Sequence, residues 1–165
     1  MAKVNPQILA SFDGAKYELG NIKHLHNRQN TKTMNDSLYF LANADFLAGD
    51  YVAVAEKFEK LAAKNHNNAQ IFNDLAATYN NMGEYNKALT AVNHIIKKIK
   101  DESAFAAAYY NAGVAREGLG ELDKALINYN LAIEKGNKSG KVASAIKRVE
   151  SNKNLAMQNT VASRV

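Results

Sequence analysis

The feature that most constrains this chain is a stretch of sequence that occurs three times. "NMGEYNKALTAVNHII" (81–96) is matched closely by "GLGELDKALINYNLAI" (118–133) and more weakly by "LAGDYVAVAEKFEKLA" (47–62). A recurrence every 30 to 40 residues is typical of folds in which one small unit stacks on copies of itself.

Each stretch contains a glycine that is followed by an acidic residue. The glycines are Gly49, Gly83 and Gly120, which lie 34 and then 37 residues apart. Apolar residues at helical spacing flank each one, as Phe72 and Tyr79 do before Gly83. Glycine permits the left-handed conformation that ends a helix, and an acid suits the positive end of the next helix. The pattern therefore predicts three antiparallel helix pairs, each turning at its glycine.

The first helix of each predicted pair combines a small residue with a large one four positions earlier. The small residues are Ala42, Ala76 and Gly113, and the large ones are Leu38, Phe72 and Tyr109. A small residue allows the two helices of a pair to approach closely, and the large residue reaches the neighbouring helix. Because one pair cannot bury its apolar stripe alone, the pairs are expected to stack.

This order of aromatic, small, glycine, acidic and tyrosine positions resembles the tetratricopeptide repeat. The resemblance covers 35–139 as three repeats, 35–68, 69–102 and 106–139, with a three-residue insertion near 103–105. It implies an all-α fold, a right-handed superhelix of antiparallel helix pairs.

The chain departs from the family pattern at a few positions. No proline closes any of the repeats, and Asp45 and Arg116 stand where the family favours an aromatic residue. Weaker local packing is expected at these two positions.

The residues after the repeats predict a capping helix. Val142, Ile146 and Val149 share one helical face, which would cover the last repeat, while lysines face the solvent. The apolar pattern fades after Leu155, so 140–165 is predicted to be a capping helix with a frayed tail.

Residues 1–34 do not fit the repeat. Ile8, Phe12 and Leu19 have helical spacing, but Asp13-Gly14 is a hairpin-turn signal between two apolar runs. A short helix or an extended arm outside the repeats is predicted, and this arm could occupy a groove of its own chain or of another copy.

By resemblance, the first helices of the pairs line a concave groove that holds a peptide segment of another protein or of another copy. Carboxamides both donate to and accept from a peptide backbone, and tyrosine supplies contact area. The alternative is that these side chains pack within the core or against 1–34. The predicted peptide-binding residues are Tyr39, Asn43, Asn73, Asp74, Asn80, Tyr110 and Asn111, and the same face carries Phe40, Phe46, Ala77, Asn81, Val114 and Glu117.

Members of the family that grip the C-terminal tails of chaperones use a clamp of lysines, asparagines and an arginine. Here the lysine positions hold Tyr39 and Ala107, the arginine position holds Asn111, and one asparagine position holds Asp74. Only Asn43 matches. Without those cations a terminal carboxylate has no charged partner, so binding of such tails is not expected.

The chain is basic, with 21 Lys and Arg against 16 Asp and Glu and a net charge of +5. Lysines cluster on the second helices, most densely in "IIKKIK" (95–100). This outward face could associate with nucleic acid or an anionic membrane through charge alone. Interleaved glutamates favour the simpler interpretation of a solvated surface.

No residue pattern indicates catalysis, a cofactor or a metal. The phosphate-loop, nucleophile-elbow and HExxH motifs are absent, and there is no cysteine. His24 and His26 are badly spaced for one metal ion, and His66 and His94 are predicted to be surface residues.

Neither a signal peptide nor a membrane span is recognisable, so a soluble protein is expected, with the cytoplasm favoured. A periplasmic location and a larger membrane-attached parent protein stay open.

The sequence thus predicts a non-catalytic scaffold or adaptor that binds a peptide segment in its groove, or associates with itself. One alternative is a chaperone of type III secretion translocators. Those proteins have a similar length, three such repeats, an N-terminal arm and a terminal helix, and their first repeat is similar to 38–61. They tend to be acidic, whereas this chain is basic.

Overall fold

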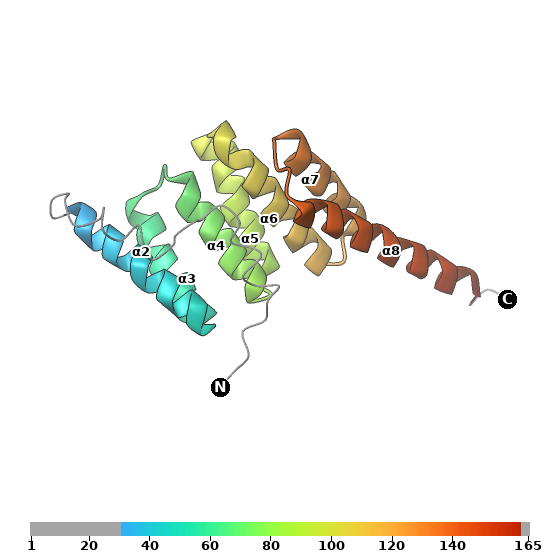
Figure 1. Ribbon diagram of the computed structural model, residues 1–165, viewed down its shortest axis with the longest axis horizontal. Helices are drawn as coiled ribbons and strands as arrows, with labels where there is room; N and C mark the ends of the chain where they lie inside the picture. Colours follow the sequence, from blue (N-terminus) through green and yellow to red (C-terminus); the bar gives the residue numbers. More distant parts are fainter. Residues whose placement is uncertain (1–30, 163–165) are drawn as a thin grey trace.

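The computed structural model describes the backbone of residues 31–162 and the side chains of residues 36–159. All regular structure in this part of the chain is helical, and the helices follow one another as antiparallel pairs along the array (Figure 1). The α-helices are α2 (Thr31–Ala48), α3 (Tyr51–Lys64), α4 (Ala69–Asn81), α5 (Tyr85–His94), α6 (Phe105–Gly118), α7 (Leu122–Glu134) and α8 (Gly140–Ala162). The all-α superhelical repeat fold is confirmed, while the arm predicted for 1–34 lies outside the described residues except for the start of α2.

The three turns within the pairs share one geometry. Gly49, Gly83 and Gly120 have φ angles of 80°, 75° and 73°, which is the left-handed region that glycine tolerates best. In each turn the residue after the glycine donates its N–H to a carbonyl five residues back, as Glu84 does to Tyr79 at 2.8 Å. The recurring sequence therefore encodes a recurring helix end, as predicted.

The acidic residue after each glycine caps the following helix in only one of the three pairs. The Asp50 carboxylate caps α3 by accepting the Ala53 N–H at 3.0 Å. Glu84 and Glu121 make no such cap, although both stand at the positive end of the following helix.

The connection between α5 and α6 contains an irregular segment. The chain passes from α5 into a π-helical turn, η2 (Ile95–Ile99), and then into a short 3₁₀ turn, η3 (Glu102–Ala104). Lys100 ends the π turn in the left-handed conformation, with φ 57°, and donates its N–H to the Ile95 carbonyl at 2.8 Å. The π-helical turn at Ile95–Ile99 thus accommodates part of the extra length of the second repeat, and it lies before the insertion predicted at 103–105.

A continuous apolar core runs from α2 to α6. Its fully buried members include Val54, Phe58 and Ile95. A second cluster joins α7 and α8 around Tyr129, Val142 and Val149, each with no exposed surface. The apolar face predicted for the capping helix is therefore confirmed, and α8 continues beyond Leu155 to Ala162, projecting past the end of the array (Figure 1).

Ion pairs occupy the two positions where the family favours an aromatic residue. The Asp45 carboxylate on α2 lies 2.5 Å from the Lys57 ammonium on α3, and Arg116 on α6 pairs with Glu121 at the start of α7. Both pairs join the two helices of one hairpin, so a polar contact replaces an apolar one at the expected weak points.

The close approach predicted at Gly113 is confirmed. A Cβ built at Gly113 would come within 2.5 Å of the Tyr129 ring. That ring cannot easily move, because it is fully buried and its hydroxyl donates to the Glu117 carboxylate at 2.8 Å. Arg148 of α8 donates to both oxygens of the same carboxylate, at 2.6 and 2.8 Å, which ties three helices together.

We expect Gly113→Ala to lower the free energy of unfolding by about 1–2 kcal/mol, because overpacking outweighs the better helix propensity of alanine. Urea denaturation measures the change. Gly140→Ala is the matched control, since a Cβ there meets nothing within 4 Å. Equal stability of the two variants would contradict the close packing of Gly113 against Tyr129.

Candidate functional site

The predicted peptide-binding residues lie on the first helices of the three pairs. We call the surface that these residues share the first-helix face. Tyr39 and Asn43 come from α2, Asn73, Asp74 and Asn80 from α4, and Tyr110 and Asn111 from α6. The structure brings most of them into contact with one another, as the alternative of packing within the array implied.

Asn73 and Asn111 are buried between α4 and α6, each with 5% of its surface exposed. The Asn111 amide donates to the backbone carbonyl of Asn73 at 3.2 Å, and the Asn73 amide donates to the Ala104 carbonyl at 3.3 Å. The Asn80 amide donates to the Asn111 carbonyl at 3.0 Å. These carboxamides therefore hold neighbouring repeats together in the structure.

Asp74 is equally buried and connects the first two repeats. Its carboxyl group accepts hydrogen bonds from the Tyr39 hydroxyl on α2 and from the Gln70 amide, the latter at 2.9 Å. Burial raises the pKa of the Asp74 carboxyl well above its usual value, because the ionised form loses hydration. The Tyr39 ring also packs edge-on against Phe58, with ring centres 5.2 Å apart.

Asn43 and Tyr110 remain partly exposed on the first-helix face. The Tyr110 ring lies 5.8 Å from that of Tyr129, between ring centres, and packs against it in a tilted arrangement. These two residues, rather than the buried amides, present groups that an incoming chain can reach.

Two amides at the end of α4 are incompletely satisfied. The Asn80 side-chain oxygen and the Asn81 side-chain nitrogen are buried and have no hydrogen-bond partner among the described residues. Both residues are partly exposed, so a rotation of either amide toward an incoming peptide backbone would give the buried atom a partner.

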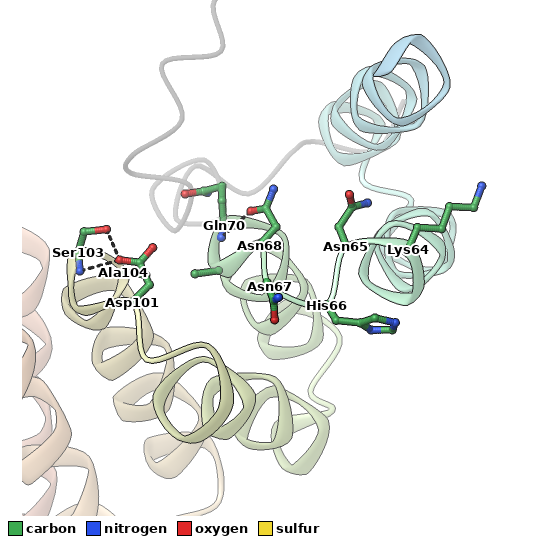
Figure 2. A pocket seen from close by; sticks show the side chains of 10 residues that line it. Lys64, Asn65, His66, Asn67, Asn68, Gln70, Asp101, Ser103 and Ala104 are labelled. Carbon is green, nitrogen blue, oxygen red and sulfur yellow. Dashed lines mark hydrogen bonds between the residues drawn. The ribbon is translucent and has the colours of Figure 1, made fainter. Parts of the chain in front are cut away.

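An open, polar hollow of about 770 Å³ lies beyond the start of α4, where the α3–α4 loop faces the segment before α6 (Figure 2). Several of its side chains already cap helices. The Asn68 oxygen accepts the Gln70 N–H at 3.1 Å, and the Asp101 carboxylate accepts the Ser103 N–H at 3.0 Å. The run "NHNNAQ" (65–70) gave no sign of a cavity, because its residue types are those of any capped loop.

The histidines give a mixed result. His24 and His26 lie outside the described residues, and His66 is exposed as predicted. His94 is only partly exposed, because its ring stacks on Phe72 at 4.1 Å between centres and its Nε2 lies 2.9 Å from the His66 carbonyl oxygen. No group of three or more potential ligands among the described residues could hold a metal ion.

Within residues 31–162, no helix combines the length and the apolar character that crossing a membrane requires.

Comparison with known proteins bears on these helix pairs directly. The family model of the tetratricopeptide repeat matches residues 45–112, from the end of α2 to the middle of α6. The chain contains tetratricopeptide repeats. The match includes the turns at Gly49 and Gly83 and the small residue Ala76, which are therefore features of that family as they occur in this sequence.

One curated relative is the heat shock protein STI1 of Saccharomyces cerevisiae, which is 31% identical over 93 residues. The match covers 56% of this chain but only 15% of STI1, so it concerns one part of a much longer protein.

Solved structures share the fold across most of the repeats. The first tetratricopeptide domain of human RPAP3 is 20% identical, with a TM-score of 0.66, covering 77% of this chain and 96% of that domain. The type III secretion chaperone SycD of Yersinia enterocolitica, in complex with a peptide of the translocator YopD, is 25% identical. Its TM-score is 0.63, covering 77% of this chain and 99% of SycD.

Burial of Asp74 makes stability depend on pH. Between the ordinary pKa of an aspartate and the raised pKa of Asp74, the unfolded chain loses its proton while the folded chain keeps it. The free energy of unfolding therefore falls as the pH rises through this window. Because an amide does not ionise, we expect Asp74→Asn to be more stable relative to the wild type at neutral pH than at pH about 4.

Urea denaturation at both pH values measures this difference, and any hydrogen bond lost in the variant contributes equally at each. Glu150→Gln on α8 is the control, because its side chain is exposed. A pH dependence that is the same for both variants would contradict a raised pKa of the buried Asp74 carboxyl.

Proposed function

We propose that this chain is a non-catalytic adaptor that binds a peptide segment of another protein along the first-helix face. The observation that carries this proposal is that Asn80 and Asn81, at the end of α4, are partly exposed and each keep one amide atom without a partner among the described residues. Asn43 on α2 and Tyr110 on α6 flank this position and add polar and aromatic contact area.

The burial of Asn73, Asp74 and Asn111 changes the predicted set of contacts. These residues support the site by fixing α2, α4 and α6 relative to one another, and the contacts with a ligand fall to Asn43, Asn80, Asn81 and Tyr110. Recognition then rests on the ligand backbone and on shape, with no cofactor.

Related structures support a peptide as the ligand. RPAP3 domains have been solved with peptides of HSP70 and HSP90, and the TPR2AB domain of yeast Sti1 has been solved in complex with pHSP90. We propose that this chain does not share the preference for such tails. Tyr39, Ala107 and Asn111 provide no cation for a terminal carboxylate, and the Asp74 carboxyl is buried behind Tyr39.

The first-helix face can be tested with a peptide selected from a random linear library on the wild-type protein. We expect Asn43→Ala combined with Asn81→Ala to weaken binding roughly tenfold or more, because each variant removes an amide worth about 1 kcal/mol. Fluorescence anisotropy with the labelled peptide gives the affinity.

The matched control is Asn130→Ala with Asn154→Ala, two exposed amides on α7 and α8. Circular dichroism verifies that both double variants keep their helices. The HSP90 peptide SRMEEVD, which is bound by the first tetratricopeptide repeat domain of Spaghetti (RPAP3), is the second probe, and we expect no saturable binding to this chain. If Asn43→Ala with Asn81→Ala binds the selected peptide as tightly as the wild type does, the peptide binds outside the first-helix face.

A second candidate function is that of a chaperone for a secreted translocator. The likeness to SycD favours it, since SycD with its YopD peptide is covered along 99% of its length. Against it stands the net charge of +5, which is unlike the acidic character expected of such chaperones.

Co-expression with YopD tests this second candidate. If this chain acts as a translocator chaperone, YopD should move from the insoluble to the soluble fraction and co-purify with the chain. Asn43→Ala with Asn81→Ala should reduce that yield, while the control pair should not. An insoluble client in every case would leave the adaptor as the proposed function.

A further inference from the structure

An open groove of about 420 Å³ lies between α4 and α5, away from the first-helix face. The α4 residues that line it are Phe72, Leu75 and Tyr79, at helical spacings of three and four. Asn73 and Asn80 lie on a different side of the same helix, roughly 105–130° around the axis from the centre of this stripe, because residues on a helix are separated by 100° per position. A ligand in this groove would therefore not compete for the first-helix face.

The groove has an apolar floor. Phe72 and Tyr79 form it from α4, and the Phe72 ring is fixed in place by the stacked imidazole of His94. His94 is itself held by its contact with the His66 carbonyl at 2.9 Å. The floor is thus preorganised, which lowers the entropic cost of binding an apolar side chain.

The rim of the groove is cationic. Lys87 lies on α5, and Lys97 and Lys98 lie on the π-helical turn that continues it. π turns are uncommon and occur often at functional sites. Lys97 and Lys98 are exposed and have no ion-pair partner among residues 36–159.

The carboxylates near the groove gather at its other end. Glu84 lies 3.6 Å from the Lys87 ammonium, and Glu59 accepts the Tyr79 hydroxyl at 2.5 Å. The uncompensated positive charge therefore belongs to Lys97 and Lys98, beside the floor formed by Phe72. A ligand fits best when its negative charges lie next to its apolar side chain on that side.

We propose that this groove is a second docking site, which binds an acidic peptide segment carrying one large apolar side chain. The apolar side chain packs against the small apolar surface that Phe72, Leu75 and Ala91 leave exposed in the groove, and the adjacent carboxylates pair with Lys97 and Lys98. A second copy of this chain is a poor occupant, because its sequence has no acidic run longer than Asp101–Glu102 and its net charge is +5.

Nucleic acid fits this groove less well than an acidic peptide. Bases bind such surfaces by stacking on open aromatic faces. Here the Phe72 ring is covered by His94, and Tyr79 is 8% exposed. Glu59 and Glu84 also repel a phosphate backbone that runs along the groove.

Two labelled synthetic peptides test the site, Ser-Gly-Leu-Phe-Asp-Glu-Glu-Asp-Gly and the same peptide with Ser-Ser in place of Leu-Phe. We expect saturable anisotropy for the first at physiological salt and an affinity at least about tenfold weaker for the second, because its apolar contact is missing. Lys97→Glu with Lys98→Glu should weaken the first peptide by about tenfold or more.

The matched control is Lys60→Glu with Lys138→Glu, which changes the net charge equally at exposed positions outside the groove. This control variant should lose several-fold less affinity for the first peptide than Lys97→Glu with Lys98→Glu does. Circular dichroism checks that each variant is folded. If Lys97→Glu with Lys98→Glu unfolds the protein, the neutral variant Lys97→Gln with Lys98→Gln is measured in its place. Asn43→Ala with Asn81→Ala should leave this binding unchanged, which separates it from the proposed adaptor function.

Three results would overturn the proposal. The first is equal affinity for both peptides, and the second is an equal loss in the control variant. The third is binding of an oligothymidylate or of phosphatidylserine vesicles that is as tight as that of the first peptide and equally sensitive to Lys97→Glu with Lys98→Glu. That result would assign the rim to nucleic acid or to a membrane surface instead.

Discussion

The packing of each helix pair against the next is the constraint on which the rest of the structure depends. One hairpin exposes an apolar stripe that only its neighbour can cover. At Gly113 this packing leaves no room for a Cβ beside Tyr129, and the Tyr129 hydroxyl is bound to Glu117, which Arg148 also holds. Burial acts to raise the pKa of Glu117, but the hydrogen bonds from Arg148 and Tyr129 outweigh it and keep that pKa below its usual value. The last repeat and the capping helix are thereby joined through one ionised carboxylate.

Polar groups between the repeats complement this apolar packing. Asn73, Asp74 and Asn111 take part in hydrogen bonds between α2, α4 and α6 instead of facing the solvent. Buried polar groups need partners at defined positions, so these bonds fix the repeats relative to one another. The orientation of the first helices, and with it the spacing of Asn43, Asn80 and Tyr110 on the first-helix face, follows from that arrangement. The two proposed docking surfaces then lie on different sides of α4, so two ligands need not compete for the same residues.

Several elements were predictable from local sequence because their causes are local. Gly49, Gly83 and Gly120 adopt the left-handed conformation that their residue type permits, and Val142 and Val149 share a helical face by spacing alone. The ion pairs of Asp45 and Arg116 were not predicted, although each partner was visible in the sequence. Helical spacing identifies which face a residue occupies, but it does not identify the residue that lies opposite on another helix. The same limit applies to His94, whose predicted surface position neglected the Phe72 ring against which it stacks.

The sequence by itself determined the helix pairs, their turns and the apolar side of the capping helix, since each depends on residues less than about ten positions apart, and it determined the repeat because these local patterns recur. Only the tertiary structure decided which polar side chains of the first helices are used within the array and which stay partly exposed. Asn73 and Asn111 are 38 residues apart in the chain, and Tyr39 and Asp74 are 35 apart. Whether such groups meet depends on how one hairpin rotates against the next, and that rotation is set by the packing of all their side chains together.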